Sequence, residues 1–318
     1  MTVPFDAPLQ DHRRWFELLA ELGYTDVWSS EADGLDGFSP LLLAAGWTSS
    51  LRLGTAIIGV YTRGPAVIAQ SAAALAEAAP GRFALGIGTS SDVIVGKWNG
   101  VAFTEPYRRA RDTLRFLRDA LAGQRIDRDY GTFAVRGFRL ARPVADPPPL
   151  YLAALRPGML RLAGREADGV IVNWLAADDV PTVVGEMKTA AGGQAGRKAV
   201  VARILVCPSQ DAAAVRAAGR RAIAAYLNVA VYAEFHRWLG RAPVLQGMWD
   251  AWQAGDRRAA LDAIGDDLVD QLIVHGSPQA CREHIRRYVS GGVTVPVIAL
   301  IGPYGELSGA IRGLAPGG

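Results

Sequence analysis

The chain has 318 residues, 50% of them apolar, so it can bury a large core as one α/β barrel or as two ordinary domains. Its formal net charge is only +3 and no block of five or more basic residues occurs, which excludes nucleic acid as an expected partner. It shows neither a signal-peptide pattern nor an apolar run of roughly 18 residues, so we expect a cytoplasmic protein with no membrane partner.

Buried strands and amphipathic helices alternate along most of the chain. We predict helices at Leu9–Leu22, Ser39–Ser50, Pro65–Ala79, Glu105–Ala122, Pro157–Arg165, Val180–Ala191 and Arg282–Ser290. We predict parallel strands at Val3–Phe5, Asp26–Ser29, Leu53–Gly59, Arg82–Gly88, Leu150–Ala154, Gly169–Asn173, Ala199–Cys207 and Val295–Ile301, and a hairpin at Ile126–Leu140. Ser39 is expected to cap its helix, with Pro40 in the first turn.

Eight strands separated by helices predict an α/β protein with a (β/α)8 TIM barrel, forming a single domain over residues 1–318. The span 211–270 is longer than one connection needs, and we interpret it as a helical insertion late in the chain. The insertion either packs as ordinary structure or forms a lid or a dimer contact. A doubly wound sheet is the alternative fold, but eight strands with one long insertion favour the barrel.

The active site of such a barrel lies at the carboxyl ends of its strands. The residues that follow the predicted strands are small, hydroxylic or aromatic, with a few charges and no histidine. The four histidines and the two cysteines, Cys207 and Cys281, show no metal-ligand spacing, so no metal is expected. A hydrolase is therefore disfavoured, and the lining is typical of a bound organic cofactor that does the difficult chemistry itself.

Two turns have both a functional and a purely structural interpretation. Gly86-Ile87-Gly88 resembles the start of GxGxxG, but the sixth position is Ser91 and Asp112 falls inside a helix, so a tight turn fits better than nicotinamide binding. The turn 154–158 opens a helix whose free N–H groups, together with Arg156, attract phosphate. Many turns of this kind bind nothing.

Several segments resemble the luciferase-like monooxygenase superfamily, most closely its branch that uses the deazaflavin coenzyme F420. They are LGTAIIGVYTRGPAVIAQSAAALAEAAPGRFALGIG, KWNG with RRARDTLRFLRDALAG, PPPLYLAALRPGMLRLAGREADGVIVNW and LVDQLIVHGSPQACREHIRRYVSGGV. These segments occur in the same order as in the family and span nearly the whole chain. The resemblance implies a TIM barrel with a late insertion, coenzyme F420 as cofactor with FMN as the alternative, a small-molecule substrate and a homodimer.

The resemblance also implies which residues bind the cofactor. A non-proline cis peptide between Ala56 and Ile57 is expected to back the deazaflavin ring, and Gly88 and Thr89 to lie under it. Asn173 is expected to bond the ring. The coenzyme's phosphate and tail are expected at Ala154, Leu155, Arg156, Pro157, Gly158 and Met159.

The chain departs from the family's sugar-phosphate dehydrogenases at their catalytic positions. Their Asp-His pair falls on Glu31-Ala32 and their second acid on Ser91, so that chemistry is not expected to transfer. Glu31 and Asp92 are the catalytic candidates: Glu31 would also bond the coenzyme, and Asp92 would supply a proton unless it is a solvated loop acid. The substrate-pocket candidates, for which core packing is the alternative, are Tyr61, Ser91, Trp98, Phe103 and Trp174.

Three functions remain in competition. The leading hypothesis is an oxidoreductase that moves a hydride between carbon 5 of the deazaflavin and a small organic substrate. The second is an FMN-dependent luciferase-like monooxygenase. The third is a barrel that binds a cofactor or partner without turnover. It is favoured by the absence of the catalytic histidine of the sugar-phosphate dehydrogenases, whose position is occupied by Ala32.

Overall fold

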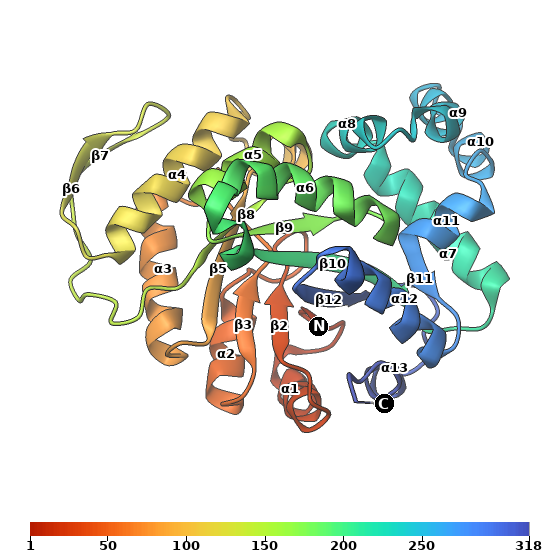
Figure 1. Ribbon diagram of the computed structural model, residues 1–318, viewed down its shortest axis with the longest axis horizontal. Helices are drawn as coiled ribbons and strands as arrows, with labels where there is room; N and C mark the ends of the chain where they lie inside the picture. Colours follow the sequence, from red (N-terminus) through yellow and green to blue (C-terminus); the bar gives the residue numbers. More distant parts are fainter. Residues whose placement is uncertain (318) are drawn as a thin grey trace. The chain divides into compact units, whose positions relative to one another are not determined.

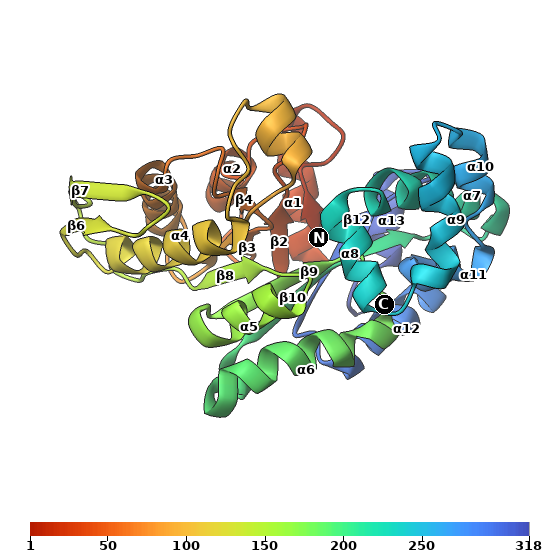
Figure 2. The ribbon, with the colours of Figure 1, turned by 90° about the horizontal axis from the view of Figure 1, so that it is seen from above.

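The computed structural model describes residues 1–317, which divide into two compact units. The first unit consists of Met1–Ile171 and Glu186–Ala199. The second consists of Val172–Gly185 and the chain from Val200 onward. Figures 1 and 2 show the helices and strands of both units in sequence colours.

A parallel sheet forms the centre of the first unit. Its strands are β1 (Thr2–Val3), β2 (Asp26–Ser29), β3 (Arg52–Thr55), β4 (Ile58–Gly59), β5 (Phe83–Gly88), β8 (Leu150–Ala153) and the first part of β9 (Gly169–Asn173), which belongs to this unit up to Ile171. They are hydrogen-bonded in the order β1-β2-β3-β5-β8-β9, and β4 pairs with β5. Because these pairings are parallel, the carboxyl ends of the strands meet at one edge of the sheet.

Helices connect these strands and cover the sheet (Figure 1). They are α1 (His12–Glu21), α2 (Ser39–Trp47), α3 (Pro65–Ala78), α4 (Pro106–Leu121) and α5 (Pro157–Glu166). An antiparallel hairpin of β6 (Ile126–Asp129) and β7 (Ala134–Phe138) packs on α4, where the ring of Phe116 lies edge-on to that of Phe133 with centroids 6.1 Å apart. The hairpin thus extends the apolar face of α4 rather than the central sheet.

Strand β5 is buried on both faces, as is typical of a central parallel strand. On one face, Phe83, Leu85 and Ile87 are each at most 4% exposed, and burying such side chains contributes about 1.5–3 kcal/mol apiece. On the other face, Gly86 and Gly88 are buried. A Cβ at Gly86 would overlap the carbonyl oxygen of Thr55. The Thr55 hydroxyl donates to Gly86 O at 2.8 Å and accepts from Gly86 N at 2.9 Å, so β3 and β5 approach closely just before both end.

The second unit contains further parallel strands, connected by helices. β10 (Ala199–Cys207) pairs with both β11 (Ile273–His275) and β12 (Val295–Leu300). The helices of this part of the chain are α6 (Val180–Ala191), α7 (Ala212–Leu227), α8 (Ala230–Trp238), α9 (Ala242–Gln253), α10 (Arg257–Asp262), α11 (Asp266–Leu272), α12 (Pro278–Gly291) and α13 (Leu307–Gly313). No helix within residues 1–317 is long and apolar enough to cross a membrane.

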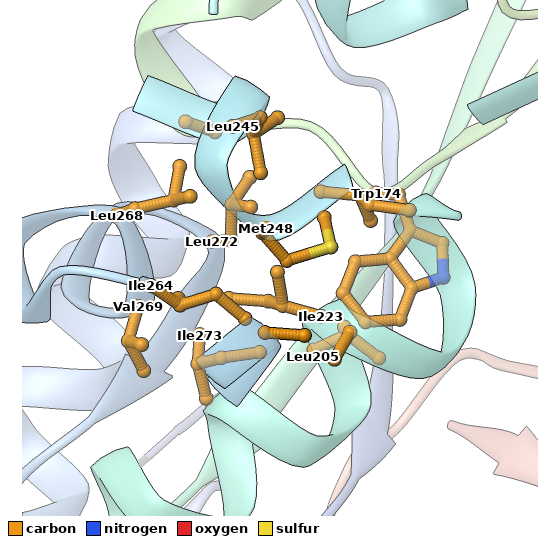
Figure 3. Packing of buried hydrophobic residues seen from close by; sticks show 14 of the residues in the cluster. Trp174, Leu205, Ile223, Leu245, Met248, Ile264, Leu268, Val269, Leu272 and Ile273 are labelled. Carbon is orange, nitrogen blue, oxygen red and sulfur yellow. The ribbon is translucent and has the colours of Figure 1, made fainter. Parts of the chain in front are cut away.

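The helices α7–α11 share one apolar core with β10 and β11. Figure 3 shows this cluster, in which Ile223, Met248 and Val269 lie between the helices and Leu205 reaches it from β10. The Trp249 indole donates to Leu227 O at 2.9 Å, which satisfies its buried N–H group. These helices occupy the range in which the insertion is predicted. The division into a single domain plus an insertion stays a prediction.

Some predicted elements differ from the structure. The predicted third strand, Leu53–Gly59, is broken into β3 and β4, and the predicted helix Leu9–Leu22 begins as a 3-10 turn, Leu9–Asp11. The strand β11 was missed because it has only three residues and follows α11 directly. The Ser39 cap was wrong: the Asp36 carboxylate accepts from Phe38 N and Ser39 N at 2.9 and 3.1 Å, and Ser39 already lies in α2.

Candidate functional site

The third strand is interrupted at its carboxyl end. A cis peptide bond joins Ala56 to Ile57, between β3 and β4, so the predicted non-proline cis bond is present at the predicted position. Ala56 N donates to Ser29 O at 2.7 Å, and pairing resumes with Ile58 opposite Ile87. The interruption therefore lies at the carboxyl edge of the sheet, between β2 and β5, where parallel α/β folds place ligands.

Gly88 ends β5 beside this interruption. It pairs with Gly59, and a Cβ at Gly88 would lie 2.9 Å from the Cβ of Ala153 and 3.0 Å from Cγ1 of Ile57. Neighbouring strands thus bring Ile57, Gly88 and Ala153 into contact. Thr89, the next residue, is half-buried. The result is a close-packed, apolar floor, which suits a flat ligand.

Glu31 lies just after β2 and is held by two donors. Its Oε2 accepts from Gly37 N at 2.8 Å and from Arg63 Nη2 at 2.7 Å. The hydrogen bond to Glu31 is the largest cause that raises the pKa of Arg63, and burial opposes it. The Arg63 guanidinium also lies over the ring of Phe38, 5.5 Å from its centroid. Glu31 is therefore a fixed acceptor, and its role as a catalytic group stays a prediction.

The loop after β5 is partly exposed to solvent. Ser91 Oγ accepts from Ile94 N at 3.3 Å, and the chain then forms one π-helical turn, Val93–Trp98. The side chain of Asp92 is exposed, and that of Trp98 is 54% exposed. The role of Asp92 as a proton donor stays a prediction. The pocket roles of Ser91 and Trp98 stay predictions.

Tyr61 and Phe103 form an aromatic pair beside these strand ends. Their ring centroids are 5.1 Å apart, and the Tyr61 hydroxyl donates to the carbonyl of Thr104. Burial is the largest cause that raises the pKa of Tyr61. Arg109 lies over the Tyr61 ring and donates to Val60 O at 3.2 Å. The loops after β4 and before α4 are thereby fixed to each other, with an apolar face.

The start of α5 has the chemistry of an anion site. Arg156 is the N-cap residue, Pro157 begins the helix, and no side chain caps the first turn. A Cβ at Gly158 would meet nothing within 4 Å, so a ligand can approach the backbone there. Ala154 N is already used, donating to Ile171 O at 3.0 Å. The first-turn N–H groups and the exposed Arg156 side chain fit a phosphate group.

The second unit carries the other two predicted site residues. Asn173 ends β9, and its Nδ2 donates to the Tyr232 hydroxyl at 3.3 Å. Trp174 has a positive φ of 53°, which bulky residues rarely adopt, and its ring packs 4.9 Å from that of Tyr226. Figure 3 shows the Trp174 indole at the edge of the apolar cluster. Packing thus holds the strained backbone and directs Asn173 toward Tyr232.

Sequence reasoning missed the polar groups around Asn173. Besides Tyr232, they include Arg203 on β10, whose side chain interacts electrostatically with Tyr226 and Tyr232. The signal was present: Arg203 is the only charged residue in the apolar strand Ala199–Cys207. It was passed over because arginine is abundant in this chain.

A second missed group is His236 on α8, which is fully buried. Burial is the main cause that lowers its pKa to about 3, and the nearby Arg241 acts in the same direction. Arg241 is itself paired with Asp179 at 2.9 Å. His236 is therefore a neutral core residue and does not replace the histidine that the strand ends lack.

Comparison with known proteins gives a family and a fold. Residues 2–295 match the family described as luciferase-like monooxygenase. The chain is 29% identical over 314 residues to 5,10-methylenetetrahydromethanopterin reductase of Methanolobus tindarius, with 96% of this chain and 94% of that protein covered.

Two solved structures resemble the chain over nearly its full length. One is the coenzyme F420-dependent tetrahydromethanopterin reductase of Methanopyrus kandleri, with a TM-score of 0.82, 21% identity, and 99% of this chain and 96% of that chain covered. The other is an F420-dependent secondary alcohol dehydrogenase in complex with an F420-acetone adduct, with a TM-score of 0.76, 16% identity, and coverage of 96% and 93%. At these identities the likeness shows the fold, an α/β fold with a curled parallel sheet. The match of residues 2–295 shows more: the chain belongs to the luciferase-like monooxygenase family.

Proposed function

We propose that the chain is a coenzyme F420-dependent oxidoreductase that moves a hydride between the coenzyme and a small organic substrate. The observation that carries the proposal is the close packing of Ile57, Gly88 and Ala153 at the carboxyl edge of the sheet, where the resemblance to the F420 branch implies the coenzyme ring. The full-length likeness to two solved structures described as F420-dependent supports the choice of F420 over FMN.

The residues of the first unit fit the coenzyme's shape and charge. The floor of Ile57, Gly88 and Ala153 would lie against the flat ring, with Thr89 beside it. The uncapped start of α5, from Arg156 through Met159, would hold the phosphate and tail, with Ala154 and Leu155 next to them. Glu31, already fixed by Arg63, would accept a hydrogen bond from the ring.

The bound deazaflavin supplies the hydride chemistry at carbon 5, and the protein's groups orient the reactants. Asn173 would donate to or accept from the ring edge while Tyr232 holds its amide. Tyr61, Phe103, Ser91, Trp98 and Trp174 would shape the substrate pocket and exclude water. Asp92 would exchange the proton that accompanies the hydride. These roles follow from the resemblance and from the placement of each residue in its own unit.

We also propose that the parallel strands close into an eight-stranded barrel and that the protein is a homodimer. Support for the dimer comes from exposed apolar side chains on neighbouring helices: Leu42 and Leu43 on α2 are 49% and 37% exposed, and Val67 on α3 is 47% exposed. Figure 1 shows α2 and α3 side by side. Clustered exposed apolar side chains are typical of protein interfaces.

Isotope transfer tests the reaction type. The protein would be incubated with reduced coenzyme F420 that carries deuterium at carbon 5 and with a panel of small ketones, imines and enones. A product that gains one deuterium, with oxidation of the coenzyme, supports the proposal. A product that instead gains an oxygen atom from labelled O2, with FMN as the required cofactor, identifies the monooxygenase alternative.

A further inference from the structure

Arg203 is a cation within a buried apolar strand. It lies in the middle of β10, where Val201, Ala202, Ile204 and Leu205 are at most 4% exposed. Its Nε is shut off from solvent and has no hydrogen-bond partner among residues 1–317. A buried charge without a counter-ion is costly, so a protein retains one only where another group compensates it.

Three other partly buried arginines of this chain are compensated by carboxylates, whereas Arg109 donates to the carbonyls of Val60 and Thr132. Arg63 pairs with Glu31 at 2.7 Å, Arg216 with Asp270 at 2.6 Å, and Arg241 with Asp179 at 2.9 Å. Arg203 forms no ion pair within the described chain. Burial is the main cause that lowers its pKa, yet guanidinium groups stay protonated in proteins, so the charge is present.

The groups that face Arg203 are hydroxyls. Tyr226 and Tyr232 both act electrostatically on its guanidinium, and their rings lie 6.0 Å apart, edge to face. The Tyr232 hydroxyl also accepts from the Asn173 amide. Tyr226 is 43% exposed, so the cluster has a side that opens to solvent. Arg203, Tyr226, Tyr232 and Asn173 together present N–H and O–H donors but no acidic group.

This donor set matches an oxyanion. The guanidinium is a planar fork whose N–H groups bind two oxygens of a carboxylate or phosphate at once, and phenol hydroxyls can donate to the same oxygens. An oxyanion would supply the counter-charge that Arg203 lacks. It would lie next to Asn173, the residue assigned to the edge of the coenzyme ring.

We propose that Arg203, with the hydroxyls of Tyr226 and Tyr232, binds a carboxylate or phosphate group carried by the substrate, which makes the substrate an organic anion. Naming the ligand as the substrate rests on the proposed function. The oxyanion site itself does not.

Direct binding of simple oxyanions tests the site. The full chain, without coenzyme, is titrated with inorganic phosphate and with benzoate against chloride at the same ionic strength, and its melting temperature is followed. Wild-type protein is expected to show a saturable increase with at least one of the two probes. Arg203→Met should weaken that binding by about tenfold or more, and Arg203→Lys by less, because lysine keeps the charge but not the fork. Absence of a saturable increase in the wild type, or its persistence in Arg203→Met, overturns the proposal.

Two controls distinguish a ligand site from a merely structural arginine. Arg258→Met removes a cation that is 94% exposed and should bind the probes like wild type. In chloride alone, Arg203→Met should melt at the same or a higher temperature than wild type, because it removes a partly buried charge that has no carboxylate partner. A large loss of stability in chloride would show that Arg203 has a structural partner and would contradict the proposal.

The same variants separate this inference from the proposed function. Arg203→Met is expected to bind coenzyme F420 as wild type does. If it loses coenzyme and oxyanion binding together, the oxyanion belongs to the coenzyme, and the assignment to the substrate is wrong. If wild type binds phosphate or benzoate but no F420, the proposed function fails while the oxyanion site stands.

Discussion

Arg63 and Glu31 form a hydrogen-bonded ion pair, with Arg63 Nη2 2.7 Å from Glu31 Oε2. The two residues are 32 positions apart and come from the loops after β2 and β4. Both side chains are mostly buried, 24% and 18% exposed respectively. Because Gly37 N also donates to Glu31, the carboxylate has a fixed orientation before any ligand binds. We infer that the pair preorganises an acceptor for the coenzyme ring.

Replacing Glu31 tests this role. Glu31→Ala should weaken binding of coenzyme F420 by about tenfold or more, since a charge-assisted hydrogen bond is lost. Fluorescence quenching of the coenzyme measures the affinity. Glu77→Ala is the matched control, because Glu77 forms an exposed ion pair with Arg142 and should leave the affinity unchanged. Equal affinities for both variants and wild type would remove Glu31 from the site.

Gly88 should tolerate no side chain. In Gly88→Ala the new Cβ would lie 2.9 Å from Ala153 and 3.0 Å from Ile57, so the strands must shift. We expect a loss of about 1–3 kcal/mol in the free energy of unfolding and weaker coenzyme binding. Gly309→Ala, in an exposed helical position with open space, should be neutral or stabilising by up to about 1 kcal/mol. Urea titrations compare the two, and a fully stable Gly88→Ala protein would contradict the packing described.

His236 should make stability depend on pH in the acidic range. Burial lowers its pKa from 6.5 to about 3, so between these values the unfolded chain binds a proton that the folded chain does not. Stability from this group is complete above about pH 6.5 and falls as the pH drops toward 3, by at most ~1.4 kcal/mol per pH unit. In His236→Leu the contribution of this group to the dependence of the free energy of unfolding on pH should vanish. Urea titrations of both proteins at pH 7, 6 and 5 measure it, and parallel slopes would show that His236 does not titrate in this way.

The apolar side chains on α2 and α3 should mediate association of two copies. If the protein is the homodimer proposed above, Leu42→Glu combined with Val67→Glu should convert it into a monomer, because the charges would have to be buried. Val244→Glu places the same charge on α9, at a side chain that is 56% exposed, and should leave the dimer intact. Light scattering after size-exclusion chromatography gives the mass. A monomeric wild type, or a dimer that survives both changes, excludes this interface.

Much of the fold follows from local patterns in the sequence. The predicted bounds of β2, β9, β10 and α6 agree with the structure at both ends, because each is a mostly apolar run with clear flanking residues. The strand β11 was missed since three residues carry no periodicity. The Ser39 cap was wrong because the helix begins one residue earlier than expected: Phe38 is the N-cap residue and Ser39 already lies in α2, where its N–H group donates to Asp36.

The site was only partly predictable. The cis peptide at Ala56–Ile57 came from the resemblance, since nothing in the local sequence requires it. The pairing of Glu31 with Arg63 and of Asn173 with Tyr232 joins residues 32 and 59 positions apart, which one sequence without homologues does not reveal. Arg203 was discounted among many arginines, although its place inside an apolar strand distinguishes it physically from surface cations.

A parallel titration of the purified protein with coenzyme F420 and with FMN tests the central claim most directly. We predict saturable quenching of F420 fluorescence that Glu31→Ala weakens, and little or no binding of FMN under the same conditions. Tight binding of FMN without binding of F420 would contradict the account.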